Sequence, residues 1–249
     1  MNNRSIRELQ LLKQSRYRKS KKKFIAEGKR LVSEALDLSS SVESIFYTKS
    51  FYKKNQSDWE NFMKIDSSLV HIISDLQFKK ISSTSTPSGI AALCRIIEIK
   101  KINFEEPLWI YLDKISDPGN LGTIMRTASW FGIKNIVLSY GSVDPYNPKT
   151  IRAGMGAHFD LNIYQNIELN EFIKTHSIIS GSNKGENISN FEFPEKYVLV
   201  LGSEAHGISK NIEKLVQKTI TIKKLGKGES LNLASAASIL MYALTSNQK

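Results

Sequence analysis

"LWIYLDKISDPGNLGTIMRTASWFGIKNIVLS", residues 108–139, decides the fold class of this chain. The pattern predicts a strand (LWIYLD), a loop, a helix over 121–131 and a second strand (NIVLS). Asp117 suits the N-cap of this helix and Pro118 its first position. Strands separated by helices favour a parallel sheet with helices on both faces. In such sheets the ligand binds at the carboxyl ends of the strands, so the loops that follow the strands are the places to look for chemistry.

The rest of the chain continues this alternation in both directions. The last helix, over about 231–244, is apolar on nearly all sides, which predicts burial in the core or against a second subunit. Residues 26–95 alternate between helix-like and strand-like segments and predict a small α/β unit. The polar stretch 98–107 separates two domains, 1–98 and 107–249. The other strands expected in the second domain are SIISGS (177–182), YVLVLG (197–202) and KTITI (218–222).

The positive charge of the chain is concentrated at its N-terminus. The 249 residues carry a formal net charge of +11, and residues 1–30 hold eleven Lys or Arg against Glu8 and Glu27. Such a cluster attracts polyanions, nucleic acids before an anionic membrane. Tyr17 and Phe24 lie among the charges, which favours RNA over a solvated arm that only maintains solubility. The candidate RNA-binding residues are Arg16, Arg18, Lys19, Lys21, Lys22 and Lys23.

Residue counts exclude several classes of protein. The single cysteine, Cys94, excludes an internal disulfide and a multi-cysteine metal site, and it fits a reducing cytoplasm. It lies in an apolar stretch, GIAALCRII, which predicts a buried and inert thiol. The histidines never pair at metal-ligand spacing, so we expect no metal. The N-terminus has no apolar segment typical of a secretory signal, and no apolar run approaches membrane-spanning length, so we expect no membrane partner.

Arg126 lies in the middle of the helix predicted over 121–131. Leu121, Ile124, Met125 and Ala128 form the core stripe of that helix. At 100° per residue, Arg126 points about 140° away from this stripe. From spacing alone it is either a solvated arginine, the slightly favoured alternative, or a group that faces a ligand.

Two glycine-bearing loops also follow predicted strands. VLVLGSEAHGIS (198–209) ends a buried strand at Gly202, where bare backbone suits a nucleotide-like ligand. Its glycine spacing is similar to that of a phosphate-binding loop, but Ile208 stands where that loop requires lysine, which excludes an NTPase. In TIKKLGKGESLN (221–232), Ser230 is predicted to be the N-cap of the last helix, whose free N–H groups would favour an anionic group.

Taken together and in this order, these stretches resemble the motifs of the SpoU-type (TrmH-like) RNA ribose 2′-O-methyltransferases of the SPOUT superfamily. The likeness covers roughly residues 107–246, and three motifs in register, each in the expected strand or helix context, are specific. The chain departs from the family pattern at Lys223, Lys224 and Gly154, near the cofactor and RNA pockets of the family. The matching segments are NLGTIMR (120–126), LGSEAHG (201–207), ESLN (229–232) and NPKTIRAGMGAHFDLNI (147–163).

The resemblance implies an α/β fold with a C-terminal, trefoil-knotted, parallel-sheet methyltransferase domain. Before it would lie a small α/β substrate-binding domain like ribosomal protein L30e. The resemblance also implies a homodimer, and S-adenosylmethionine as methyl donor, held by the knot loops at Gly202, Ile222 and Leu231. It predicts an enzyme that methylates a ribose 2′-hydroxyl in RNA, with ribosomal RNA preferred because of the basic N-terminal domain and transfer RNA as the alternative. The family's functional polar positions match Asn120, Arg126, Glu204, Ser230 and Asn232.

The family mechanism makes the arginine that matches Arg126 the general base, assisted by phosphate. Because the guanidinium pKa lies above about 12, we hypothesise instead that Arg126 fixes the phosphate beside the target ribose and lowers the pKa of its hydroxyl. Ser230, Asn232 and Asn120 would orient the ribose and the loops, and Glu204 would tether Asn120 or Arg126.

Two rival functions come from other classes of protein. The first is a non-catalytic RNA-binding or ribosome-assembly protein on the same fold, and the retained polar residues of the motifs weigh against it. The second is a nucleotide-dependent dehydrogenase, but the glycine fingerprint after its first strand is missing.

Overall fold

In the computed structural model, which describes residues 2–38, 41–62, 65–99 and 101–246, LWIYLD forms the strand β5 (Leu108–Leu112). β5 lies inside a six-stranded sheet of order β10-β8-β9-β5-β6-β7, in which every neighbouring pair is parallel. Ile110 pairs with Leu199 on one side and with Ile136 on the other. The predicted parallel α/β sheet is therefore confirmed. Its other strands are β6 (Asn135–Leu138), β7 (Asn162–Gln165), β8 (Ser177–Asn187), β9 (Tyr197–Leu201) and β10 (Lys218–Thr221).

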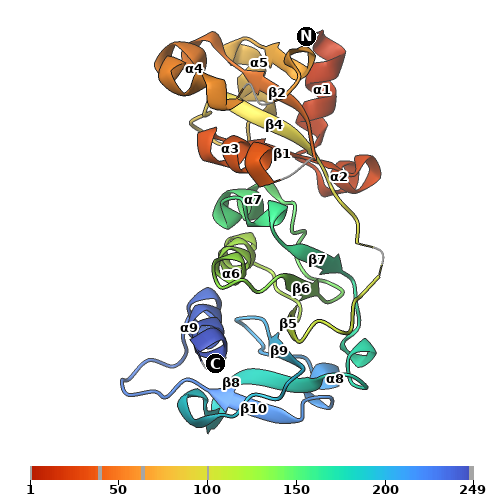
Figure 1. Cartoon of the computed structure of the whole chain (residues 1–249), viewed down its shortest axis with the longest axis vertical. Coiled ribbons are helices and arrows are strands. Elements are labelled where there is room, and N and C mark those ends of the chain that lie inside the picture. Colours follow the sequence, from red (N-terminus) through yellow and green to blue (C-terminus); the bar gives the residue numbers. More distant parts are fainter. Residues whose placement is uncertain (1, 39–40, 63–64, 100, 247–249) are drawn as a thin grey trace. The chain divides into compact units, whose positions relative to one another are not determined.

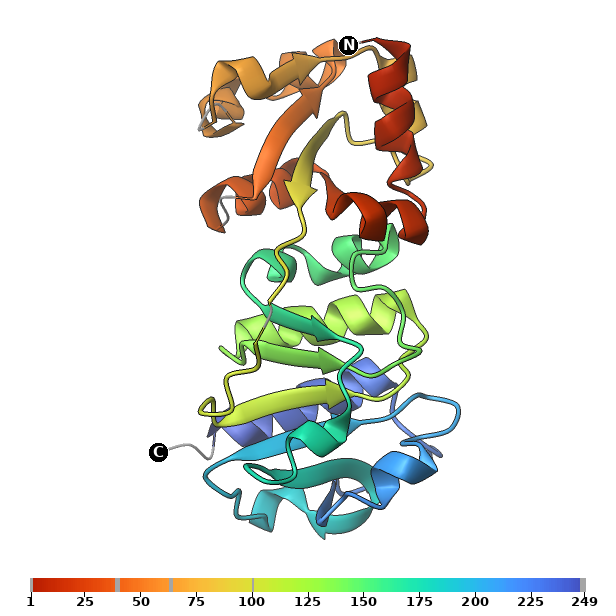
Figure 2. The same cartoon turned by 90° about the vertical axis from the view of Figure 1, so that its right-hand side faces the viewer.

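Helices cover both faces of this sheet, since the inner strands are apolar on both sides. α6 (Pro118–Trp130) and α9 (Leu233–Ser246) pack against each other on one face (Figures 1 and 2). α8 (Lys210–Glu213) lies on the other face, over a core that includes Trp109 and Phe172. The short 3-10 turns η4 (Leu169–Glu171) and η5 (Ile188–Asn190) also belong to this unit.

The first turns of α6 and α9 carry side-chain caps. Asp117 Oδ1 accepts from Asn120 N at 2.8 Å, as expected for the predicted N-cap, and α6 begins at Pro118. At α9, Asn232 Oδ1 accepts from the N–H groups of Ala234 and Ser235 at 2.9 and 3.2 Å. The prediction that Ser230 caps α9 is therefore wrong, because the helix begins three residues later and Asn232 takes that place.

A second, four-stranded sheet of order β1-β4-β2-β3 belongs to the first unit. β4 pairs antiparallel with β1 and β2, while β2 and β3 are parallel. Residues 26–95 alternate between helices and strands, as the sequence analysis predicts. The elements are α1 (Asn3–Leu11), α2 (Ser15–Lys21), β1 (Lys23–Glu27), α3 (Lys29–Leu38), β2 (Val42–Tyr47), α4 (Lys49–Lys54), η1 (Gln56–Phe62), η2 (Ser67–Leu69), β3 (Val70–Ile72), α5 (Asp75–Ile81) and β4 (Ile90–Arg95).

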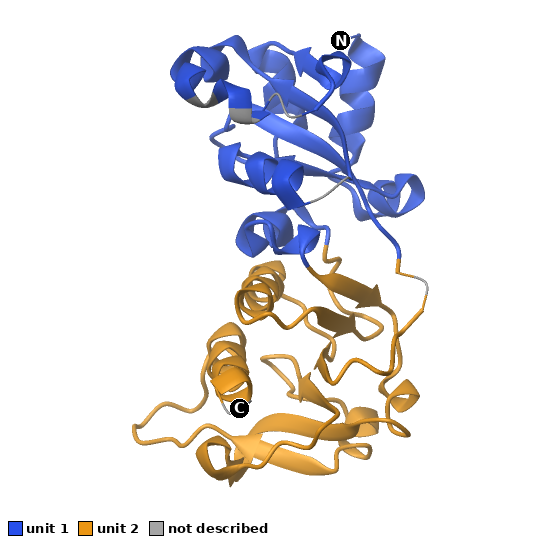
Figure 3. Cartoon of the chain, viewed as in Figure 1, with its two compact units in different colours: residues 1–98, 146–160 blue, residues 99–145, 161–249 orange. Residues whose placement is uncertain are grey.

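Residues 146–160, which the sequence analysis places in the C-terminal domain, pack in the structure with the first unit (Figure 3). They contain α7 (Pro148–Gly154) and η3 (Ala157–Phe159). The ring of Phe24 in β1 lies 5.1 Å from that of Tyr146 and stacks on Phe159 at 6.0 Å. The two units are thus residues 1–98 with 146–160, and residues 99–145 with 161–249. Ring packing across a long sequence separation, which no local pattern reveals, sets this division.

Candidate active site

The carboxyl ends of β5, β6 and β9 lie side by side, and each is followed by a loop. Asp113 N donates to Leu201 O at 2.8 Å, and Ser139 N donates to Leu112 O at 3.1 Å. These bonds carry the parallel register one residue past the end of each strand. The loops that the sequence analysis singled out after β5 and β9 therefore start from the same edge of the sheet.

Three of the predicted polar residues meet at this edge in one chain of hydrogen bonds. Asn120, in the first turn of α6, donates from Nδ2 to Glu204 Oε1 in the loop after β9. Asn232 Nδ2, at the N-cap of α9, donates to Asn120 Oδ1 at 3.1 Å. One residue from each motif is thus joined through the two ends of a single side-chain amide. Of the two tethers considered for Glu204, the structure shows the one to Asn120.

The loop after β9 folds back on itself, and glycine is required where it does so. Ser203 and Gly207 exchange two backbone hydrogen bonds of 3.0 and 2.9 Å, and Gly207 has a φ of +64°. A Cβ on Gly202 would lie 2.0 Å from the carbonyl carbon of Gly207, so a larger residue there would collide with backbone. The glycines of this loop therefore bring its backbone together, and they hold Glu204 in front of Asn120.

Asp113 is a residue of this site that the sequence analysis did not single out. Its side chain is 2 % exposed, and Oδ2 accepts from Ser209 N at 2.7 Å. The carboxylate thereby fixes the far end of the loop after β9 to the end of β5. The available signal was a charged residue directly after a fully apolar strand, because a buried carboxylate requires a hydrogen-bond donor.

Arg126 and Ser230 do not take part in this hydrogen-bonded chain. Arg126 is exposed on α6, and within the described residues no hydrogen bond or ion pair is recorded for its guanidinium. The core stripe of α6 is buried as predicted, so Arg126 faces solvent. Ser230 is also exposed, in the loop before α9. The structure leaves both side chains available to a ligand.

The three residues expected to hold the cofactor lie at the ends of two loops. Gly202 is buried at the end of β9, Ile222 is half-buried after β10, and Leu231 is 52 % exposed before α9. Between the last two, Lys223 and Lys224 are exposed, and a Cβ on Gly226 would meet nothing within 4 Å. Gly154, the other departure from the family pattern, is buried in α7 of the first unit.

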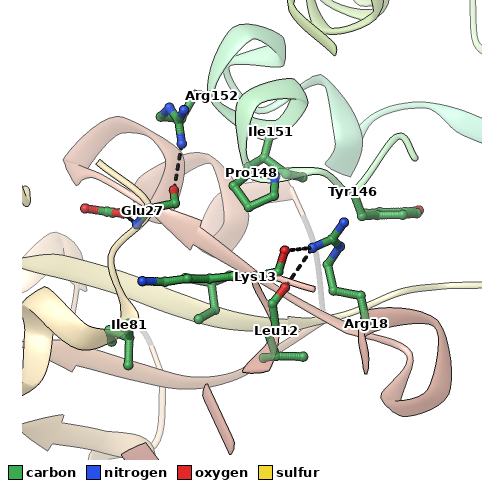
Figure 4. Close-up of a pocket in the computed structure, with 11 residues that line it drawn as sticks. Leu12, Lys13, Arg18, Glu27, Ile81, Tyr146, Pro148, Ile151 and Arg152 are labelled. Atoms are coloured by element: carbon green, nitrogen blue, oxygen red, sulfur yellow. Dashed lines mark hydrogen bonds between the residues drawn. The ribbon is translucent and has the colours of Figure 1, made fainter. Parts of the chain in front are cut away.

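The structure divides the predicted RNA-binding cluster of the first unit. Arg18 is 2 % exposed, and Nη1 donates to the carbonyls of Leu12 and Lys13 at 2.8 Å each (Figure 4). It satisfies carbonyls that the end of α1 leaves without helical partners, so its prediction as an RNA contact is corrected. Lys22 and Lys23 form ion pairs of 2.6 Å with Glu98 and Glu43. The cluster members that are exposed and have no ion pair recorded among the described residues are Arg16, Lys19 and Lys21.

Arg18 lines a small cavity of the first unit together with Lys13, Glu27 and Tyr146 (Figure 4). Burial lowers the pKa of Lys13, with Glu27 opposing this effect. The Glu27 carboxylate accepts from Ser82 Oγ at 2.7 Å and from Ser83 N at 3.1 Å. The Glu27 carboxylate thus holds the loop before β4.

The remaining expectations concern the thiol, metals and membranes. Cys94 is buried in β4 as predicted, and burial, with a smaller effect of Glu43, raises the pKa of its thiol. Among the described residues, no group of three or more His, Cys, Asp or Glu side chains is placed to hold a metal ion. None of the described helices is long and apolar enough to cross a membrane.

Comparisons with known proteins bear on both units. The chain is 29 % identical to 23S rRNA (guanosine(2553)-2′-O)-methyltransferase RlmP of Bacillus subtilis, over 97 % of this chain and 96 % of that protein. A TrmH-family protein from Porphyromonas gingivalis superposes with a TM-score of 0.84 at 28 % identity, covering 98 % and 97 % of the two chains. The SpoU methyltransferase AviRb of Streptomyces viridochromogenes, solved with AdoMet, shares the fold at 20 % identity, with a TM-score of 0.84 over 100 % and 98 % of the chains.

Two family models match the chain. The model of the MRM3-like substrate binding domain matches residues 3–92. That of the SpoU rRNA Methylase family matches residues 107–242, which is more than half of the chain and contains the whole hydrogen-bonded site. The chain therefore belongs to the SpoU rRNA methylase family.

Proposed function

We propose that this chain is an enzyme that transfers a methyl group from S-adenosylmethionine to a ribose 2′-hydroxyl in ribosomal RNA. The observation that carries the proposal is the hydrogen-bonded chain from Glu204 through Asn120 to Asn232. It joins the three motifs at the edge where a parallel α/β sheet binds its ligand. RlmP, which is similar to this chain over nearly the whole length of both proteins, is named as a 2′-O-methyltransferase of 23S rRNA.

The residues at this edge fit S-adenosylmethionine. When bound, this cofactor supplies an electrophilic methyl group on a sulfonium. Gly202 offers backbone without a side chain at the buried end of β9. Ile222 and Leu231 would contact the cofactor with their apolar side chains, and their backbone groups would be available for hydrogen bonds to it. The carboxylate of Glu204 and the amide of Asn120 lie next to this backbone and would orient the ribose of the substrate or the closing loops.

Arg126 would act on the RNA and not on the cofactor. Its exposed guanidinium can grip a phosphate through two parallel N–H donors. A cation beside the target ribose lowers the pKa of the 2′-hydroxyl and stabilises the alkoxide that develops as oxygen attacks the methyl carbon. Ser230, exposed in the loop before α9, would hydrogen-bond to the same nucleotide.

The enzyme would act as a homodimer through α6 and α9. α9 buries one face in its own unit but leaves Ile239 41 % and Tyr242 61 % exposed, and Trp130 at the end of α6 is 84 % exposed. The ring of Tyr242 lies 6.1 Å from that of Phe131 at the end of α6, so apolar side chains of the two helices meet where a second copy could cover them. The trefoil knot and the cytoplasmic location stay predictions from the resemblance and from the single reduced cysteine.

The test is transfer of a labelled methyl group to RNA by the purified chain. We expect label in ribosomal RNA from cells that lack this protein, and nuclease digestion followed by mass spectrometry should place it on a 2′-O-methylated nucleoside. RNA from cells that contain the protein is the control, because its site is already filled. Label in transfer RNA alone would show that transfer RNA is the substrate. Absence of label from both RNAs would favour a non-catalytic RNA-binding protein.

A further inference from the structure

The first unit carries a group of partly exposed aromatic rings that the methyltransferase site does not use. β2 ends at Tyr47, and α4 follows at once (Figure 1). The ring of Trp59 in η1 lies 4.4 Å from that of Tyr47 and 4.9 Å from that of Tyr52, nearly perpendicular to the latter. Tyr52 is 38 % exposed, and Tyr47 and Trp59 are half-buried. We name these residues, with Lys49, Lys53 and Lys54, the aromatic–lysine patch.

Buried rings pack against the patch, and hydrogen bonds hold the start of α4 in place. Trp59 contacts the ring of buried Phe62, which meets Phe51 edge-on at 5.9 Å. Thr48 Oγ1 caps α4 by accepting from Phe51 N at 3.1 Å. Ser50 Oγ donates to Asp75 Oδ1 at 2.5 Å and ties the start of α4 to that of α5. Because the rings are held in place before any ligand arrives, little ordering is left to oppose binding.

The lysines of the patch contribute positive charge beside the rings. α4 reads KSFYKK, with no acidic residue. Lys49 is three residues before Tyr52 and four before Lys53, so it neighbours both of them on the surface of the helix. All three lysines are exposed, and no ion pair is recorded for them in the part of the chain that the structure describes. In the sequence, the acids nearest to these lysines are Asp58 and the exposed Glu60 of η1. The exposed Asp75 lies against Ser50 at the start of α4, so Lys53 and Lys54 at the other end of α4 supply the positive charge next to Tyr52.

We propose that the aromatic–lysine patch binds unpaired bases of the RNA substrate, with the rings stacking on bases and the lysines neutralising the adjoining phosphates. Single-stranded nucleic acid is bound in this way, through aromatic faces beside a positive track. An acidic protein surface could pair with the lysines as well, but the match of residues 3–92 to the model of a substrate binding domain favours RNA. The inference rests on the proposed RNA substrate and assigns to the first unit a contact separate from Arg16, Lys19 and Lys21.

Tryptophan fluorescence tests the stacking directly. The chain has three tryptophans, of which Trp109 is fully buried, so in Trp130→Phe the ligand-sensitive emission comes from Trp59. The probe is a uridine oligonucleotide of about ten nucleotides, within the length that such sites cover. We expect saturable quenching by this strand and none by an RNA duplex of equal length, since paired bases cannot stack on the rings. Absence of quenching, or equal quenching by the duplex, would overturn the proposal.

Substitutions in the patch provide the second measurement. Tyr52→Ala should raise the Kd for the oligonucleotide about tenfold, while Tyr52→Phe, which keeps the ring, should stay within about twofold. Lys53→Gln should flatten the dependence of log Kd on log salt by about 0.7, and Lys174→Gln, an exposed lysine of the other unit, should not. An unchanged Kd in Tyr52→Ala would sink the inference. Because binding is measured without cofactor, loss of methyl transfer would count against the proposed function and not against the patch.

Discussion

Asn120 uses its backbone N–H and both ends of its side-chain amide to hold the site together. Its backbone N–H donates to the N-cap Asp117, its Nδ2 to Glu204, and its Oδ1 accepts from Asn232. Only a side chain with both a donor and an acceptor end can serve a carboxylate and an amide at once. Asparagine is therefore needed for a chemical reason, whereas Arg126, on the same helix, has no partner recorded among the described residues and is left for the substrate.

The prediction at this scale concerns Arg126, replaced by alanine and by lysine. The rate of methyl transfer at saturating RNA should fall about a hundredfold or more in Arg126→Ala, because the developing alkoxide loses its cation. Lysine should rescue little, since a point-charged ammonium cannot copy the two parallel donors of the guanidinium. Single-turnover transfer of a labelled methyl group measures both.

Calorimetric titration with S-adenosylmethionine is the control for both Arg126 variants. The affinity should be that of the unchanged chain, because Gly202, Ile222 and Leu231 are intact. Near-normal turnover in Arg126→Ala would show that this residue is a plain solvated arginine.

At the scale of elements, the site is built by loops that connect strand ends to helix starts. The loop after β9 is closed by the Ser203–Gly207 bridge at one end and by the bond from Ser209 N to Asp113 at the other. α6 and α9 each begin at a capped turn, and Asn120 and Asn232 lie in those turns. The elements thus place the polar groups, and their positions depend on how tightly the loop after β9 is folded.

Gly202→Ala should therefore damage the site more than the addition of a single methyl group suggests. The added methyl group would lie 2.0 Å from backbone, so the loop must open and carry Glu204 away from Asn120. We expect weaker binding of S-adenosylmethionine, by tenfold or more, and a lower midpoint of thermal unfolding, measured by calorimetry. Gly226→Ala is the matched control, because its Cβ would meet nothing within 4 Å. Equal behaviour of the two variants would contradict the close packing of the loop after β9.

For the whole molecule, the important feature is which of the basic side chains behind the net charge of +11 are buried or paired and which are exposed. In the first unit, Arg18 is buried and serves the end of α1, while Lys22 and Lys23 are paired with acids. From the sequence alone, all three of these residues are candidate RNA contacts. Of the predicted cluster, Arg16, Lys19 and Lys21 stay exposed, as do the lysines of the aromatic–lysine patch, and these are the charges that we propose for RNA.

Two sets of variants should separate these roles. Replacing Arg16, Lys19 and Lys21 together by glutamine should lower the slope of log K against log salt by about 2 to 3 and leave stability unchanged. Arg18→Gln should instead reduce the free energy of unfolding by about 1–3 kcal/mol, since buried carbonyls lose their donor. Filter binding over a salt series and urea denaturation measure the two quantities. A triple variant with an unchanged slope would make the cluster a solubilising surface.

The sequence by itself determined the parallel α/β sheet, the three motifs that meet in the hydrogen-bonded chain and the family. These are encoded locally, in alternating apolar segments, in Asp117 and Pro118 at a helix start and in glycines at strand ends. It did not determine that Arg18 is buried, that Asn232 and not Ser230 caps α9, that Asp113 holds the loop after β9, or that residues 146–160 pack with the first unit. Each of these depends on a partner distant along the chain or on the residue at which a helix starts. Hydrogen bonding and ring packing between distant residues become definite only when the tertiary fold brings the partners within a few ångströms of each other.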